Sequence, residues 1–211
     1  MINRLLTALF SCSLLVSFSS HAAQSLSSTE CGVDRARLLA LDEQQFDQDM
    51  AGGWRAVADK PGCNVAAADL IRDWRRKHGV SPGLLIWHEA QLRASSGQTP
   101  EAIALMTQAR RGPGVPDKSG WNIYVDASIA FLRKDMAALQ QQRAKLAAVA
   151  PPSGPNAPVI VVDGYFDVDM GNGETMKMRW PPNIDVVDGL IACFDKPYAE
   201  AYRSECQPCR Q

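Results

Sequence analysis

Apolar residues recur every three or four positions along most of the chain, which is the spacing of helices with one buried face. Glycine and proline separate these amphipathic stretches. Many of the stretches are joined by only a few residues, and helices so closely connected lie antiparallel. The pattern predicts helices over residues 31–50, 64–79, 82–97, 99–111, 121–135, 135–150, 183–194 and 196–206. We therefore predict a mainly all-α fold of stacked antiparallel helical hairpins.

One stretch does not follow the helical spacing. Residues 159–180 begin with a β-branched run and continue with alternating apolar side chains on both sides of a Gly-Asn-Gly turn. This arrangement predicts a short β-hairpin or an ordered loop. It lies within a predicted insertion, residues 151–182, which opens with a proline-rich linker and precedes a C-terminal helical pair over residues 183–206.

The N-terminal residues have the three-part layout of a secretory signal peptide. Arg4 precedes an uncharged apolar run, and small residues follow it, so we expect cleavage after Ala22 or Ala23. The apolar run is shorter than the ~20 residues that a membrane-spanning helix needs. We therefore expect a signal peptide over residues 1–23 and a single domain over residues 24–211, located in the periplasm or secreted.

The charge balance narrows the classes of partner. The formal net charge is −1 at pH 7 and no basic stripe stands out, which argues against nucleic acid and anionic membranes as partners. After the predicted signal peptide, no stretch has the length and apolar character of an integral membrane segment. The hydrophobic fraction of 46% is typical of a folded globular chain.

The cysteines predict disulfide bonds. An exported chain meets an oxidising compartment, and five of the six cysteines follow the predicted signal peptide. Cys31 and Cys63 flank the first helical region, whereas Cys193 and Cys206 each close one helix of an antiparallel pair. We predict these two bridges, with Cys209 as a free or intermolecular thiol. A bridge between Cys206 and Cys209 is the alternative.

The Cys206–Cys209 spacing alone does not make a redox or metal site. Only two residues follow Cys209, so there is no room for the helix that lowers the thiol pKa in thioredoxin-type motifs. A zinc site would need a second cysteine pair or paired histidines, which the mature sequence lacks. Residues 167–174 start like a calcium loop, but Asn172 and Met178 replace its required glycine and glutamate. We therefore expect no cofactor and no bound metal.

Residues 84–149 resemble degenerate tetratricopeptide repeats, which are helix–turn–helix units whose helices touch through small side chains. In the second helix Ala102, Met106 and Ala109 are similar to the family's A-x3-F-x2-A positions. Residues 97–102 look like the family's inter-helix turn. Outside these repeats the chain is similar to exported proteins of Gram-negative bacteria.

Trp87 and Trp121 are separated by 34 positions, which is the length of this repeat. In the family the inner helices line a concave groove that holds a peptide or a partner protein. The resemblance therefore implies an exported interaction module that binds a peptide or protein partner without catalysis. Carried over from the two tryptophans, the groove residues are His88, Leu92, Asn122 and Asp126.

An enzyme of unknown reaction is the alternative. His88, Glu89 and Asp126 would act as acid–base groups in a helical cleft, because histidine and carboxylates are the usual proton-transfer groups. His88-Glu89 also starts like the zinc-protease motif HExxH, but Leu92 stands at the position of the second histidine. The sequence contains no G-x-S-x-G, P-loop or dinucleotide fingerprint. The sequence therefore favours binding over catalysis and names no substrate.

Overall fold

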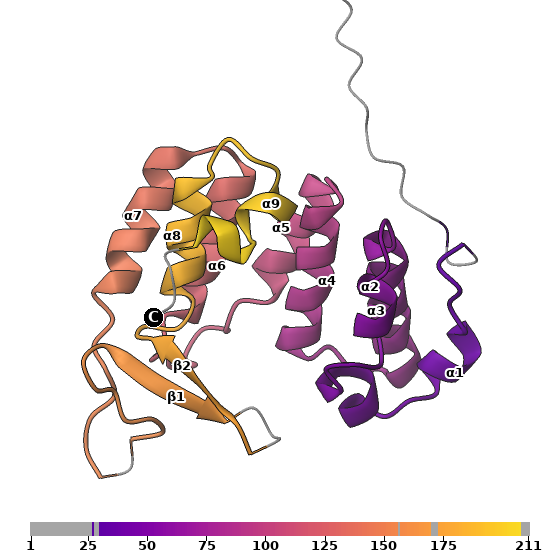
Figure 1. The fold of residues 1–211 in the computed structure, drawn as a ribbon, viewed down its shortest axis with the longest axis horizontal. Helices are drawn as coiled ribbons and strands as arrows, with labels where there is room; N and C mark the ends of the chain where they lie inside the picture. The colour runs from indigo at the N-terminus through magenta and orange to yellow at the C-terminus, as the bar shows by residue number, and fades with distance from the viewer. Residues whose placement is uncertain (1–26, 28–29, 156, 170–172, 208–211) are drawn as a thin grey trace, which may run out of the picture.

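The computed structural model describes residues 27, 30–155, 157–169 and 173–207. The predicted signal peptide and Cys209 lie outside the described residues. The described chain is mainly helical, as the apolar spacing predicts (Figure 1). Its elements in chain order are α1 (Arg35–Leu39), the π-helical turn η1 (Gln44–Gln48), α2 (Arg55–Ala58), α3 (Asn64–His78), α4 (Gly83–Ser95), α5 (Thr99–Gln108), α6 (Trp121–Leu132), α7 (Met136–Ala147), β1 (Tyr165–Asp169), β2 (Thr175–Arg179), α8 (Ile184–Ala192), α9 (Tyr198–Ala201) and the 3-10 turn η2 (Ser204–Cys206).

Several connections between helices follow from residues that are visible in the sequence. α3 ends at Gly79 and the α4–α5 turn contains Gly97, both with left-handed backbones at φ of 64° and 75°. Asp135 caps α7, since its side chain accepts a hydrogen bond of 2.9 Å from the Ala138 N–H. These tight connections make α3 with α4, α4 with α5, and α6 with α7 into antiparallel pairs.

The N-terminal helix differs from the prediction. Instead of one helix over residues 31–50, the chain forms α1 and η1 with a break between them. Asp34 accepts a hydrogen bond of 3.1 Å from the Arg37 N–H, and Asp42 accepts one of 2.8 Å from the Gln45 N–H. Aspartate side chains that bond the nearby backbone compete with a continuous helix, so each one starts a new turn here.

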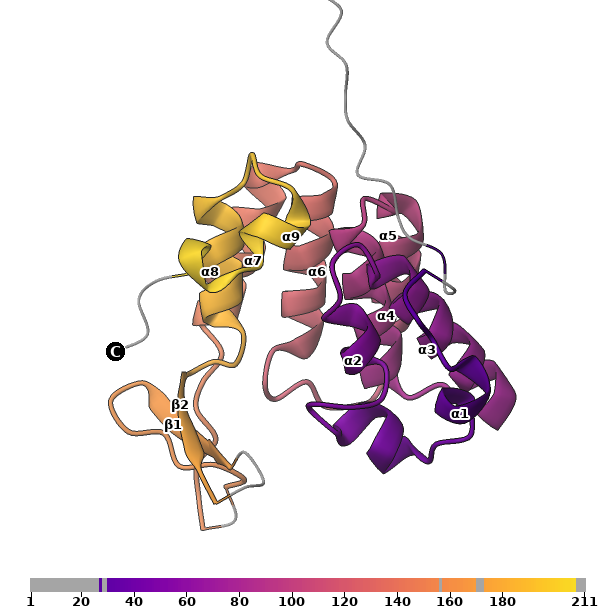
Figure 2. The ribbon, with the colours of Figure 1, turned by 45° about the vertical axis from the view of Figure 1, so that its right-hand side comes forward.

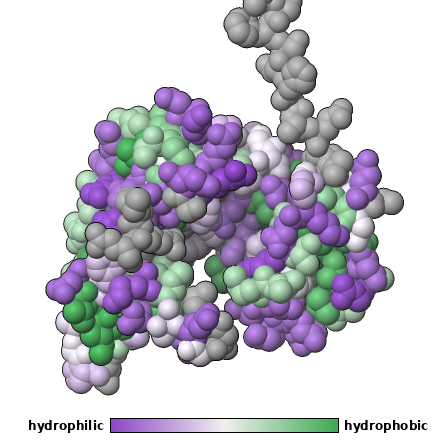
Figure 3. Space-filling view, viewed as in Figure 1, coloured by the Kyte–Doolittle hydropathy of each residue, from purple (hydrophilic) through white to green (hydrophobic). Residues whose placement is uncertain are grey.

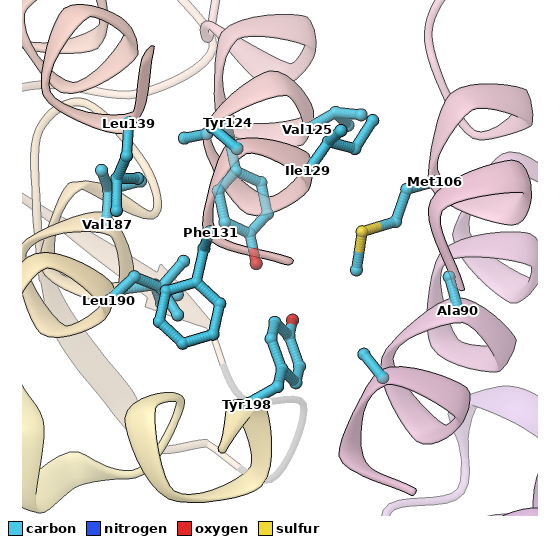
Figure 4. Packing of buried hydrophobic residues seen from close by; sticks show 14 of the residues in the cluster. Ala90, Met106, Tyr124, Val125, Ile129, Phe131, Leu139, Val187, Leu190 and Tyr198 are labelled. Atoms are coloured by element: carbon cyan, nitrogen blue, oxygen red, sulfur yellow. The ribbon is translucent and has the colours of Figure 1, made fainter. Parts of the chain in front are cut away.

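Helix α4 has two buried faces and joins two hydrophobic cores. Leu85 and Leu92 lie in the N-terminal core, together with residues of α1 to α3. Ile86 and Ala90 lie in the second core, which α5 to α9 complete. Figure 4 shows this second core, where the labelled side chains of α4 to α9 turn toward one another. A helix with both faces covered cannot present an open concave surface, which limits where a partner binds.

The central hairpins meet through aromatic side chains. The rings of Trp87 in α4 and Trp121 in α6 pack edge to face with centroids 5.1 Å apart. Tyr124 of α6 lies 5.0 Å from Trp87 and 5.8 Å from Trp121. Such aromatic pairs stabilise beyond their buried area. The two tryptophans that are 34 positions apart in the sequence are therefore in contact in the fold.

The predicted insertion forms an antiparallel β-hairpin in which Tyr165 lies opposite Arg179. Arg179 anchors the hairpin to α8 through Asp185 at 2.6 Å and Asp188 at 3.3 Å. Figures 1 and 2 both show the hairpin projecting below the helices. The tip that would hold a calcium ion includes residues 170–172, which lie outside the described residues.

The face of the molecule in Figure 3 is mostly polar. Hydrophobic colour gathers at its lower left, over the segment that leads into β1. Ile160 and Val162 in this segment are 80% and 62% exposed. The segment that leads into β1 therefore exposes two large apolar side chains.

Two disulfide bonds close the described chain. Cys31–Cys63 links the N-terminal segment to the start of α3, and Cys193–Cys206 links the end of α8 to η2. These are the two bridges that the cysteine positions predict, and they indicate an oxidising environment. None of the helices in the described ranges combines the length and the apolar character needed to cross a membrane.

Candidate functional site

Two of the predicted groove residues, His88 and Leu92, point toward the N-terminal core. The His88 ring lies 5.0 Å from the Trp54 ring, and Leu92 is buried among residues of α2 and α3. The side of α4 that the repeat resemblance makes concave is therefore covered by the N-terminal helices.

The other two, Asn122 and Asp126, contact the residues that follow α5. Asn122 accepts a hydrogen bond from the Arg111 N–H at 2.8 Å and donates one to the Arg111 carbonyl at 3.1 Å. Asp126 forms an ion pair with Arg110. The structure thus places the four predicted residues in two separate pairs rather than around one groove.

The residues of the acid–base alternative also have separate surroundings. His88 Nε2 lies 3.8 Å from Asp47 Oδ1, and the Trp54 Nε1–H donates to that same oxygen at 2.8 Å. Burial lowers the pKa of His88, and the nearby Asp47 carboxylate opposes this shift. Asp126 pairs with Arg110, at a different place in the fold. His88 and Asp126 therefore do not join Glu89 in one acid–base site.

Glu89 is the centre of a buried ion network. It is 2% exposed, and its carboxylate accepts hydrogen bonds from Arg75 of α3 at 2.5 Å and from Arg93 of α4 at 3.1 Å. Arg93 also donates to Asp69 at 2.9 Å and to Gln98 at 2.8 Å. A buried charge is tolerated only when partners of this kind replace its hydration. Glu89 and Arg93 are four residues apart, so both lie on one face of α4 and pair along it.

The network continues across the outer side of α3. Arg72 donates to Asp69 at 2.7 Å and to Asp73 at 3.0 Å, and Arg35 of α1 also pairs with Asp73. Arg76 lies 3.9 Å from Asp73. Burial raises the pKa of Asp73, but the hydrogen bonds and charges of Arg72 and Arg35 together outweigh this effect and lower the pKa.

Arginines outnumber carboxylates in this network. Its ion pairs involve five guanidinium groups and three carboxylates, which leaves an excess of two positive charges. The five arginines are Arg35, Arg72, Arg75, Arg76 and Arg93, and the three carboxylates are Asp69, Asp73 and Glu89. An excess of one sign on a partly buried surface attracts a ligand of the opposite sign.

A cavity of about 430 Å³ opens beside these charges. The end of α3, the α3–α4 connection, the middle of α4 and the end of α5 surround it. Arg72, Arg75 and Arg76 line one wall, and Val80 and Leu105 provide apolar wall. We call this cavity the arginine pocket.

Arg75 has a donor that the described protein groups leave unsatisfied. Its Nε is buried and has no hydrogen-bond partner, while its Nη2 donates to Glu89. An unmatched buried donor is costly. Arg75 lines the pocket, so the wall combines net positive charge with a guanidinium group whose buried Nε lacks an acceptor.

The arginine pocket was not predicted, although its signal is present in the sequence. The three arginines stand at positions 72, 75 and 76, a spacing that places them on one face of a helix. A solvent-exposed charged face has the same pattern, so the spacing alone predicts no site. Only the position of α4 and α5 against that face creates the pocket.

No group of three or more histidine, cysteine, aspartate or glutamate side chains that could hold a metal ion occurs in the described part of the chain.

Comparisons with protein-family models, with curated proteins and with solved structures find no match to this chain. Its function must therefore be argued from the arginine pocket and the fold.

Proposed function

We propose that this protein is an exported interaction module that binds an acidic segment of a peptide or protein partner in the arginine pocket. The observation that carries the proposal is the excess of two positive charges in the ion network beside a cavity that Arg72, Arg75 and Arg76 line. Carboxylates suit guanidinium groups because the planar fork donates in a geometry that matches them.

The size and walls of the pocket favour a peptide segment over a small inorganic anion. Its volume of about 430 Å³ is within the range of ligand pockets. Val80 and Leu105 add apolar wall that a free inorganic anion would leave unused. A peptide brings both a carboxylate and carbon atoms to such a site.

The fold supports a binding role through its rigidity. Two cores meet at α4, and the buried ion pair of Arg75 with Glu89, two residues that line the pocket, connects α3 with α4. The two disulfides and the predicted signal peptide together support a partner in the periplasm or outside the cell. The acid–base alternative has less support, because His88 and Asp126 do not line the arginine pocket.

The test is a titration of the mature protein with fluorescein-labelled oligoglutamate, followed by fluorescence anisotropy. Arg76→Gln removes a pocket charge from a side chain that is 74% exposed, so the fold should be retained. We expect binding to weaken by up to about fivefold, the range for one exposed ion pair. Arg133→Gln is the matched control, because it removes an exposed charge just after α6, outside the residues that line the pocket.

Equal weakening by Arg76→Gln and Arg133→Gln would mean that the oligoglutamate binds through overall charge. If oligoglutamine of the same length bound as tightly as oligoglutamate, carboxylates would not be recognised. Either result would overturn the proposed function.

A further inference from the structure

A second depression lies beside the arginine pocket and is lined mainly by apolar groups. Its volume is about 260 Å³, and Gly83, Leu84, Ala109, Arg111 and Trp121 line it. We call it the Leu84 pocket. It lies between the start of α4, the end of α5 and the start of α6.

The two pockets are neighbours. Gln108 lines the arginine pocket and Ala109, the next residue, lines the Leu84 pocket. A side-chain carbon built on Gly83 would lie 3.8 Å from the Ala109 carbonyl oxygen, so the start of α4 touches the end of α5 between them. A few residues of extended chain are long enough to reach from one pocket to the other.

Two large apolar side chains remain exposed at this edge. Val80 beside the arginine pocket is 40% exposed, and Leu84 in the second pocket is 47% exposed. Exposed apolar surface with a polar rim is typical of interaction sites. Both side chains come from the same short connection between α3 and α4 and its first helical turn.

The floor of the Leu84 pocket is fixed in place. The Trp121 Nε1–H donates to the Ala109 carbonyl at 2.8 Å, and its ring packs against Trp87. The Asp117 carboxylate accepts hydrogen bonds from the backbone N–H groups of Trp121 and Asn122, both at 2.7 Å. A rigid aromatic surface loses little entropy on binding, which favours a preformed site.

We propose that the partner segment carries a bulky apolar side chain near its acidic group, with the carboxylate in the arginine pocket and the apolar side chain in the Leu84 pocket. This inference rests on the proposed function and names the class of peptide that the same surface recognises. The excess positive charge beside the arginine pocket selects an acidic segment over a basic or neutral one. The apolar pocket then selects among acidic segments.

The test is selection of a random peptide library, displayed on phage, against the immobilised mature protein. We expect the selected peptides to share an aspartate or glutamate within a few positions of a leucine, isoleucine, phenylalanine or tryptophan. A selected peptide, made synthetically and labelled, is then titrated with Leu84→Ser and with Met50→Ser. Met50 is 68% exposed and lines neither pocket, so it is the matched control.

We expect Leu84→Ser to weaken the selected peptide about tenfold, the effect of losing one buried apolar contact, and Met50→Ser to leave it unchanged. Two results would overturn the two-pocket inference and leave the proposed function standing. The selected peptides could share acidic residues without an apolar one, or Leu84→Ser could bind the selected peptide as tightly as the parent protein. Selected peptides without an acidic preference would overturn both.

Discussion

Glu89 and Arg93 form a buried ion pair one helical turn apart on α4, with Arg93 Nη2 and Glu89 Oε1 3.1 Å apart. Glu89 also neutralises Arg75 of α3, so a single carboxylate serves two guanidinium groups. We expect Glu89→Ala to lower the free energy of unfolding by about 3–5 kcal/mol, because it leaves two buried cations without their shared anion. Urea unfolding followed by circular dichroism measures this loss.

Glu101→Ala is the matched control for that change. Glu101 is exposed in the first turn of α5, where a carboxylate stabilises only through the helix dipole. We expect this control to cost less than about 1 kcal/mol. Equal losses for the two variants would show that the network around Glu89 contributes nothing beyond a surface charge.

His88 makes stability depend on pH. Burial lowers the pKa of His88 in the folded state below its ordinary value of 6.5. Below pH 6.5 the unfolded chain therefore binds a proton that the folded chain does not, and stability falls as the pH decreases. At higher pH both states hold a neutral ring and the effect disappears.

When the pH is lowered from neutral to below 6.5, the free energy of unfolding should fall less in His88→Gln than in the parent protein. Urea unfolding at a series of pH values measures both slopes. An unchanged slope in the variant would assign the pH dependence to other groups, such as the carboxylates of the ion network.

Much of the fold could be predicted from the sequence because its signals are local. Helical spacing, left-handed glycines such as Gly79 and the cap at Asp135 act over a few residues, and they place α3 to α7 closely. The break between α1 and η1 was missed, because Asp34 and Asp42 are equally compatible with a continuous amphipathic helix. Which backbone groups an aspartate binds depends on the surrounding packing.

The candidate site was harder to predict because it depends on contacts between distant residues. The pairing of Asp126 with Arg110 depends on how α6 packs against the residues that follow α5. In the same way, Arg75 and Glu89 come from different helices and form one network only after α3 and α4 pack. A helical periodicity fixes which face a residue occupies, but not which other helix covers that face.

Asp117 stabilises the start of α6 although it lies outside that helix. Its two carboxylate oxygens accept hydrogen bonds from the N–H groups of Trp121 and Asn122, which would otherwise lack partners at the helix start. We expect Asp117→Ala to lower the free energy of unfolding by about 1–2 kcal/mol, the range for a helix cap. Asp135→Ala, which removes the cap of α7, should cost about 1 kcal/mol and is the comparison.

Thermal and urea unfolding of these two variants measure how much each cap contributes to the free energy of unfolding. The Asp117 variant should also broaden the indole signal of Trp121 in NMR spectra, because the first turn of α6 holds that side chain. If Asp117→Ala unfolded like the parent protein, the contacts of its carboxylate would contribute nothing to stability.

The two disulfides should differ in their resistance to reduction. Cys31 and Cys63 are each 2% exposed, whereas Cys193 and Cys206 are half-buried. Reduction requires a thiolate to reach a sulfur atom, so the more exposed bridge should open first. We expect a titration with dithiothreitol, followed by alkylation and peptide mass spectrometry, to show Cys193–Cys206 opening while Cys31–Cys63 is still intact.

The same mass spectrometry without reductant tests the pairing itself. Mature protein should yield linked peptides for Cys31 with Cys63 and for Cys193 with Cys206. A linked Cys206–Cys209 peptide would contradict this pairing, and it would move a thiol-exchange role for the C-terminal segment ahead of a purely structural one. Simultaneous opening of both bridges would instead show that access to the sulfur atoms does not control their reduction, because global unfolding would then precede it.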